Sequence, residues 1–141
     1  LVRLYSDVLD ESLVLGRETV AAAASPLAAI RDLIASRVAY TCRNRALLKV
    51  CFEEEHELPG ELADEVLRRR RAFEDLFLTA LTSHLAAHPA ALTGMTPKVY
   101  VNMCLGAVNW CYKWYRSDGP SGPEELGQQI ARVLTTAIDP S

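Results

Sequence analysis

Residues 97–126 of the sequence, PKVYVNMCLGAVNWCYKWYRSDGPSGPEEL, contain a long apolar segment, a break rich in Gly and Pro, and a restart at two glutamates. Between residues 98 and 115 the apolar side chains point in every direction of a helix. A helix that is apolar on all sides must be covered on all sides. One small domain can cover one side, so we expect a partner chain, a ligand or both on the other.

The helix that follows the break is predicted to return antiparallel beside the first one. It begins at Pro123, which suits a first helical turn, and its two glutamates suit the helix dipole. Its apolar stripe is Leu126, Ile130, Val133, Leu134 and Ile138. Small residues on both helices allow their backbones to approach closely, so two such helices from each of two subunits would form a four-helix seam. The predicted dimer interface consists of Gly106, Ala107, Gly127, Ile130, Ala131 and Leu134. In the alternative interpretation, Trp110 and Trp114 fill the core of the monomer.

The rest of the chain also has helical periodicity, with no sustained alternation typical of strands. One helix is predicted from the start to about Ala24, and a second begins at Ser25-Pro26, a capping residue followed by a proline. A short helix holds Leu47, Leu48, Cys51 and Phe52, and residues 58–60 form a break. The longest helix runs from Glu61 to about His88. The sequence therefore predicts an all-α fold of about six helices.

Length and composition restrict the possible functions. The 141 residues fit one domain, and a net charge of −3 argues against a free-standing nucleic-acid binder, which would need a basic face. The four cysteines, without a signal peptide, indicate reduced thiols in a cytoplasmic protein. No apolar run reaches the roughly 18 residues of a membrane span. We therefore expect a soluble protein with no membrane partner.

Two segments of the sequence resemble the regulatory domain of the TetR family of transcriptional regulators, especially the branch that senses lipid or steroid catabolites as coenzyme A thioesters. The first is Leu105-Gly106, Asn109-Trp110, Tyr112, Trp114-Tyr115-Arg116, Gly119 and Pro123-Glu124-Glu125. The second is Asn44-Arg45, Leu47-Leu48, Phe52, residues 53–55, Leu58-Pro59 and Leu62. The opening LVRLYSDVLDESL is similar to the helix that follows the DNA-reading head of the family. Gly122 departs from the Ser or Thr common there and is a weaker helix cap.

This resemblance implies an effector-sensing and dimerisation domain of a repressor that releases DNA when a small apolar ligand binds. The family places a helix-turn-helix domain of about 50 residues before the point where this sequence starts, so contact with DNA would be made only through that domain. The implied partners are a second copy of the chain and an apolar effector, for which this branch of the family points to coenzyme A thioesters. No cofactor is implied. The alternative is a stand-alone helical protein-interaction module.

Eight residues are predicted to bind the effector. The apolar body of the ligand would lie among apolar and amide side chains of the central helices, and the phosphates of a coenzyme would meet two arginines of the long helix. The set is Phe52, Phe73, Phe77, Asn102, Met103, Trp110, Arg68 and Arg71. A run of arginines is more often a solvated helix face, which is the alternative for residues 68–71.

The remaining polar clusters do not predict chemistry. His84 and His88 are four residues apart on the long helix, but two ligands do not make a zinc site, so we expect surface histidines. Glu53 and Glu57 lie in a hydrated acidic turn, with too few converging oxygens for a cation. No nucleophile–base pair or phosphate-binding glycine loop is present, and the sequence does not indicate an enzyme.

Overall fold

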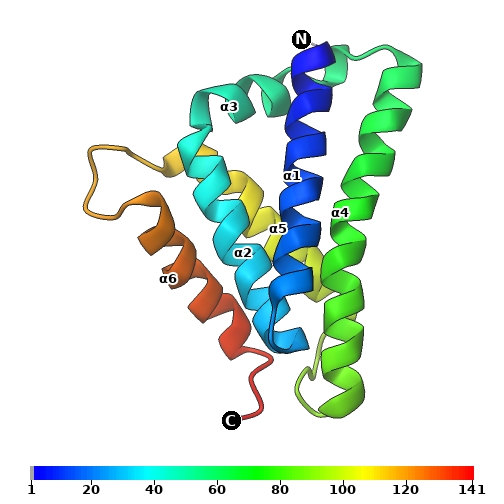
Figure 1. The fold of residues 1–141 in the computed structure, drawn as a ribbon, viewed down its shortest axis with the longest axis vertical. Helices are drawn as coiled ribbons and strands as arrows, with labels where there is room; N and C mark the ends of the chain where they lie inside the picture. Colours follow the sequence, from blue (N-terminus) through cyan, green and yellow to red (C-terminus); the bar gives the residue numbers. More distant parts are fainter. Residues whose placement is uncertain (1) are drawn as a thin grey trace.

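The structure, a computed structural model, describes residues 2–141 and consists of helices joined by short turns (Figure 1). The helices are α1 (Val2–Ala22), α2 (Pro26–Arg43), α3 (Arg45–Glu53), the 3-10 turn η1 (Glu55–Glu57), α4 (Gly60–Ala87), α5 (Pro97–Trp114) and α6 (Pro123–Thr136). The described residues contain no strand. The predicted all-α fold of six helices is confirmed.

The helix starts at Pro26 and Pro123 agree with the sequence prediction, and the structure adds a cap at the start of α5. Ser25 caps α2, because its Oγ accepts a hydrogen bond from the Ala28 amide at 3.1 Å, and Pro26 occupies the first turn. Thr96 caps α5 in the same way through the Val99 amide at 3.3 Å. Gly122, which has no side chain to accept a capping hydrogen bond from the first-turn amides, precedes α6. The first helix ends at Ala22, slightly before the predicted position.

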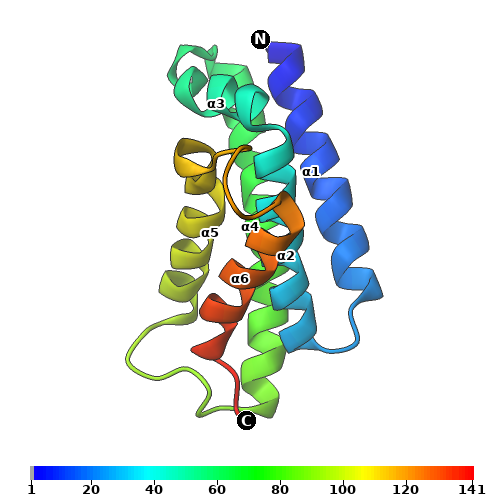
Figure 2. The same ribbon diagram turned by 90° about the vertical axis from the view of Figure 1, so that its left-hand side faces the viewer.

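α2 is the central helix of the bundle. Figure 1 shows α1 and α4 running along one side of it and α6 lying on the other, with α5 behind. α3 and η1 cross one end of the bundle, and Figure 2 shows α5 and α6 together on one face. Most of α2 is therefore covered by other helices, and its buried residues include Ile30, Leu33, Ile34, Val38 and Thr41, each at most 1% exposed.

The helix α6 packs closely against α2 of the same chain. A Cβ atom on Gly127 would lie 2.5 Å from the carbonyl oxygen of Ala35, so only glycine allows this approach. Ala131, one turn further along α6, is fully buried in the monomer. The structure thus differs from the prediction that Gly127 and Ala131 lie between subunits: these small residues serve the packing of α6 on α2.

Two further predictions concern buried polar side chains. His84 was expected at the surface, but it is only 3% exposed, and its Nε2 donates a hydrogen bond to the Ile138 carbonyl at 2.7 Å. This bond attaches the end of α6 to α4, which periodicity could not reveal. Cys42, Cys51, Cys104 and Cys111 are free, in agreement with the predicted reduced thiols, and all four are buried.

Candidate functional site

A cavity of about 300 Å³ lies inside the bundle, between α1, α2, α4 and α5, with α3 and η1 at one end. Its volume is at the lower end of the range for small-molecule sites. Apolar walls alternate with charged and amide groups. The lining residues are Leu9, Ser12, Arg37, Phe52, Glu55, Arg69, Arg70, Phe73, Glu74, Leu105 and Asn109.

Ion pairs hold two of the arginines at the cavity wall. Arg70 donates from Nη1 to Glu55 at 2.5 Å and from Nη2 to the Tyr5 hydroxyl at 2.6 Å, which ties α4 to η1 and α1. Arg69 donates from Nε to Asp10 at 2.7 Å and lies 2.9 Å from Glu65 on its own helix. These contacts fix the α1–α4 side of the cavity.

Arg37 of α2 has a different environment. Its side chain is only 9% exposed and lies over the Phe73 ring, with Cζ 4.5 Å from the ring centroid. Among residues 2–141, no carboxylate forms an ion pair with it, and its buried Nε has no hydrogen-bond partner. Burial, together with the nearby Arg70 charge, lowers the pKa of Arg37 to about 10, so the guanidinium remains charged at neutral pH.

Two neutral polar groups at the same cavity are also without partners. Neither Oγ of Ser12 on α1 nor Oδ1 of Asn109 on α5 makes a hydrogen bond within the described part of the chain. Buried polar groups are normally paired, because an unpaired one keeps the full cost of its desolvation. The cavity therefore contains binding capacity that the protein itself does not use.

The predicted ligand-binding residues separate into five groups in the structure. Phe52 and Phe73 line the cavity, whereas Phe77 is buried in the core beside Phe73, with ring centroids 5.6 Å apart. Asn102 and Met103 are exposed on α5. Trp110 lies on the outer face, away from the cavity lining. The remaining two, Arg68 and Arg71, are exposed on α4.

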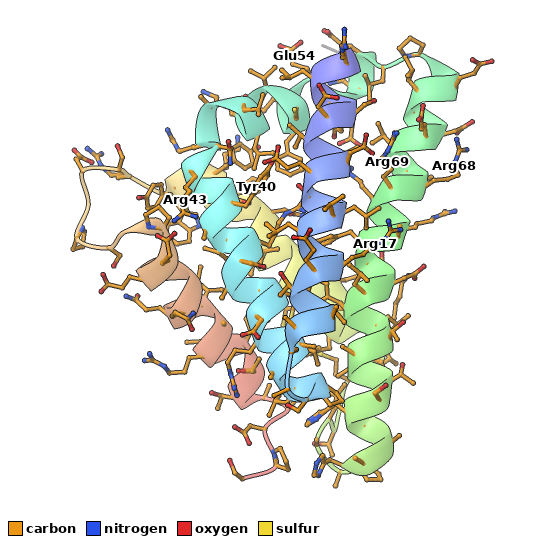
Figure 3. All side chains as sticks on the ribbon, viewed as in Figure 1. Arg17, Tyr40, Arg43, Glu54, Arg68 and Arg69 are labelled. Atoms are coloured by element: carbon orange, nitrogen blue, oxygen red, sulfur yellow. The ribbon has the colours of Figure 1, made fainter. Side chains whose placement is uncertain are left out.

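Figure 3 shows why the arginine run divides. Arg69 points toward α1, whereas Arg68 points to the opposite side of α4, because consecutive residues of a helix lie about 100° apart. The sequence reasoning selected Arg68 and Arg71, and the structure brings Arg69 and Arg70 to the cavity instead.

Sequence reasoning missed Arg37, although a signal was present. Arg37 follows Leu33 and Ile34 by four and three residues, so it lies on the apolar stripe of α2. A charged residue within such a stripe is a stronger indication of a site than a run of charges on an open face. Ser12 also lies among apolar residues on one side of α1, four residues after Val8 and three before Leu15.

An apolar groove of about 680 Å³ lies on the outside, between α5 and α6. Trp110 is 59% exposed, Trp114 is 51% exposed and Val133 is 72% exposed, so the tryptophans do not fill the core of the monomer. Nothing lies within 4 Å of a Cβ built on Gly106. Four of the predicted interface residues line this groove, namely Gly106, Ala107, Ile130 and Leu134.

The described part of the chain contains neither a metal-ligand cluster nor a helix that could span a membrane. No three His, Cys, Asp or Glu side chains among residues 2–141 come together as metal ligands. No helix in the same range combines the length and the apolar character that crossing a bilayer requires.

Comparison with known proteins identifies the fold. Residues 23–138 match the model of a family described as tetracyclin repressor-like, C-terminal domain. No curated protein sequence matches the chain. Among solved structures, a TetR/AcrR regulator from Thermobifida fusca YX-ER1 is 24% identical with a TM-score of 0.81, covering 96% of this chain and 70% of its own.

Two further solved structures are similar. The ketosteroid regulator KstR2 of Mycobacterium tuberculosis is 16% identical with a TM-score of 0.83, covering 94% of this chain and 68% of that one. AibR, solved with isovaleryl coenzyme A and operator DNA, is 22% identical with a TM-score of 0.70, covering 97% and 73%. At these identities the likeness concerns the fold. Because the family model matches most of its length, the chain belongs to the tetracyclin repressor-like C-terminal domain family and is a domain of a TetR-family transcriptional regulator, not an enzyme.

Proposed function

We propose that this chain is the effector-sensing and dimerisation domain of a TetR-type repressor that releases its operator when a small ligand enters the internal cavity. The observation that carries the proposal is the cavity itself, enclosed by four helices and containing polar groups that the protein leaves without partners. DNA would be bound only through a helix-turn-helix domain outside this sequence, and the regulator would act in the cytoplasm beside its operator.

The second element of the proposal is dimerisation through the α5–α6 groove. Gly106 and Ala107 leave room for a helix to approach, and Trp110, Trp114 and Val133 supply the apolar surface around them. The occupant that fits is the same face of a second copy, because a two-fold axis places the α5–α6 face of each subunit against the α5–α6 face of the other. Stable interfaces of this kind bury on the order of 1,600 Å² or more.

The mechanism follows from the shared helix. α5 contributes Leu105 and Asn109 to the cavity on one side and Gly106 and Trp110 to the groove on the other. A ligand that favours one position of α5 therefore favours one arrangement of the two subunits and of their DNA-binding heads. The effect on operator affinity is limited to the ligand's differential affinity for the two arrangements, typically about 1–3 kcal/mol.

Sedimentation of the 141-residue chain tests the dimer. We expect a dimer at micromolar concentration and a monomer with unchanged helicity for Gly106→Leu, because the new side chain has open space in the monomer but fills the groove. Ala131→Arg should instead unfold the chain, since Ala131 is in the core. A monomeric wild-type chain would contradict the dimer and leave the stand-alone interaction module as the alternative.

For the effector, coenzyme A thioesters are one candidate class, since AibR was solved with such a ligand. The cavity would hold the acyl group, and the phosphates would remain outside, near the exposed Arg68 or Arg71. Arg68→Ala and Arg71→Ala should then weaken octanoyl coenzyme A but not octanoate in a thermal shift assay, with Arg132→Ala on α6 as control. Equal effects on both ligands would contradict the role of these arginines.

A further inference from the structure

We propose that the effector carries a carboxylate and that Arg37 binds it inside the cavity. This inference rests on the proposed function, because it names the chemical class of ligand that the same cavity takes.

Four of the five charged side chains at the cavity wall form ion pairs within the chain. The five are Arg37, Glu55, Arg69, Arg70 and Glu74. Glu55 pairs with Arg70 at 2.5 Å, and Glu74 pairs with Lys98 of α5 at 2.5 Å. Arg69 pairs with Asp10 and Glu65. Within residues 2–141, Arg37 is the charged group of the wall without an ion-pair partner.

The Arg37 guanidinium is therefore a buried charge without an opposite charge beside it in the described part of the chain. A charge taken out of water is strongly unfavourable unless a partner compensates it. The Phe73 ring beneath the Arg37 guanidinium recovers only part of that cost, because a ring face attracts a cation less strongly than a carboxylate does. A ligand that supplies the missing negative charge would therefore bind with the full strength of a desolvated ion pair.

The shape of the Arg37 guanidinium suits a carboxylate. A guanidinium presents Nε and Nη in a planar fork that fits the two oxygens of a carboxylate, and the buried Nε of Arg37 has no partner within the described chain. The Ser12 hydroxyl can donate a further hydrogen bond, and the Asn109 amide can do so in its other orientation. A cation would be repelled by Arg37, and a neutral ligand would leave its charge uncompensated.

The remaining wall defines the other end of the ligand. Leu9, Phe52 and Leu105 give the cavity an apolar part, and its volume of about 300 Å³ suits a small body. The ligand class is thus a small monocarboxylate with an apolar body, such as a medium-chain or aryl-substituted acid.

The test uses octanoate, octanamide, octylamine and octanoyl coenzyme A with the 141-residue chain, measured by calorimetry and thermal shift. We expect octanoate to bind at least tenfold more tightly than octanamide, and octylamine not to bind. Arg37→Met should remove the preference for octanoate, and Arg37→Lys should keep part of it, because the charge remains but the fork is lost. Arg17→Met, the same change at an exposed position of α1, should have no effect.

The melting temperature without ligand separates binding from a structural role. Arg37→Met should raise it, because an apolar side chain replaces a buried charge that has no partner. A lower melting temperature together with an unchanged preference for octanoate would mean that Arg37 only supports the fold, and would overturn the proposal.

The binding of these four ligands distinguishes the carboxylate proposal from the proposed function. Equal binding of octanoate and octanamide, or binding of the thioester alone, would overturn the carboxylate while the sensing cavity stands. If octanoate binds through Arg37 but changes neither the dimer nor the operator affinity of the full-length regulator, the carboxylate site stands and the proposed function fails. Failure of octanoate to bind overturns the carboxylate proposal, and operator release in the full-length regulator then decides the function independently.

Discussion

Single atoms decide how closely the helices of this domain pack, and Gly127 is the clearest case. The Cβ of an alanine there would lie 2.5 Å from the Ala35 carbonyl oxygen and 3.3 Å from its Cα, which are backbone atoms that cannot rotate away. The helices α2 and α6 would have to separate. The absence of one methyl group therefore sets the position of the last helix.

Gly127→Ala should lower the free energy of unfolding by about 1–3 kcal/mol, the usual cost of overpacking. Urea denaturation followed by circular dichroism measures the loss. Gly122→Ala is the matched control, because its added Cβ meets nothing within 4 Å, and it should change stability by less than about 1 kcal/mol. Equal effects of the two changes would show that α6 can shift without cost.

The buried thiols predict how stability depends on pH. Burial raises the pKa of Cys104 from 9.0 to about 11, so the unfolded chain loses this proton before the folded chain does. The contribution is fully present below about pH 9 and is lost as pH rises toward 11, on the order of 2 kcal/mol. Unfolding experiments between pH 8 and 11 should show this decline. Cys104→Ala should make the decline shallower, and an identical slope would contradict the assignment.

At the scale of elements, α5 separates two environments. Tyr100, Val101, Cys104 and Val108 face the core and are at most 1% exposed, whereas Met103, Trp110 and Trp114 on the other side are between 43% and 59% exposed. The same helix also contributes to the cavity. This position allows a ligand inside the domain to influence the surface outside it.

The end of α6 is held by hydrogen bonds from neighbouring helices. The Tyr100 hydroxyl of α5 donates to the Leu134 carbonyl at 2.7 Å, close to the bond between His84 and Ile138. Both acceptors are carbonyls near the C-terminal end of α6, where helical partners are missing. The two bonds fix α6 on the bundle and keep its apolar edge beside α5.

Tyr100→Phe should lower the free energy of unfolding by about 1 kcal/mol, because the Leu134 carbonyl loses its donor. Amide exchange in the last turn of α6 should become faster. Tyr115→Phe is the control, since Tyr115 is also buried on the bundle but its hydroxyl forms no hydrogen bond within residues 2–141. Faster exchange in both variants would indicate a general loosening instead.

For the whole molecule, the groove makes stability depend on concentration. If two copies associate through α5 and α6, the melting temperature should rise with protein concentration, because dimerisation stabilises the folded state. For Gly106→Leu it should be independent of concentration over the same range, for example from 1 to 100 μM. A concentration-dependent melting temperature in this variant would locate the interface elsewhere.

The sequence by itself determined the helices and the character of their faces. Ser25-Pro26 and Pro123 indicated two helix starts, because capping and proline geometry are local. The apolar side chains on all sides of residues 98–115 indicated that one domain could not cover this helix completely. Trp110 and Trp114 are indeed exposed in the monomer. These properties depend on neighbours within a few residues, which the sequence shows directly.

The tertiary structure decided which faces meet, because contacts between helices depend on residues far apart in the chain. Gly127 and Ala131 pack on α2 and not in the groove, since α6 rests on α2. Arg69 and Arg70 reach the cavity while Arg68 and Arg71 do not, since the burial of the apolar stripe of α4, which includes Val66, Phe73 and Phe77, fixes the rotation of this helix. Arg37 was recognised as a candidate binding residue only from the packed structure, in which it lies at the cavity with residues of α4 and α5 and has no carboxylate partner among residues 2–141. Periodicity gives the side of a helix on which a residue lies, whereas only the packed bundle determines what that side faces.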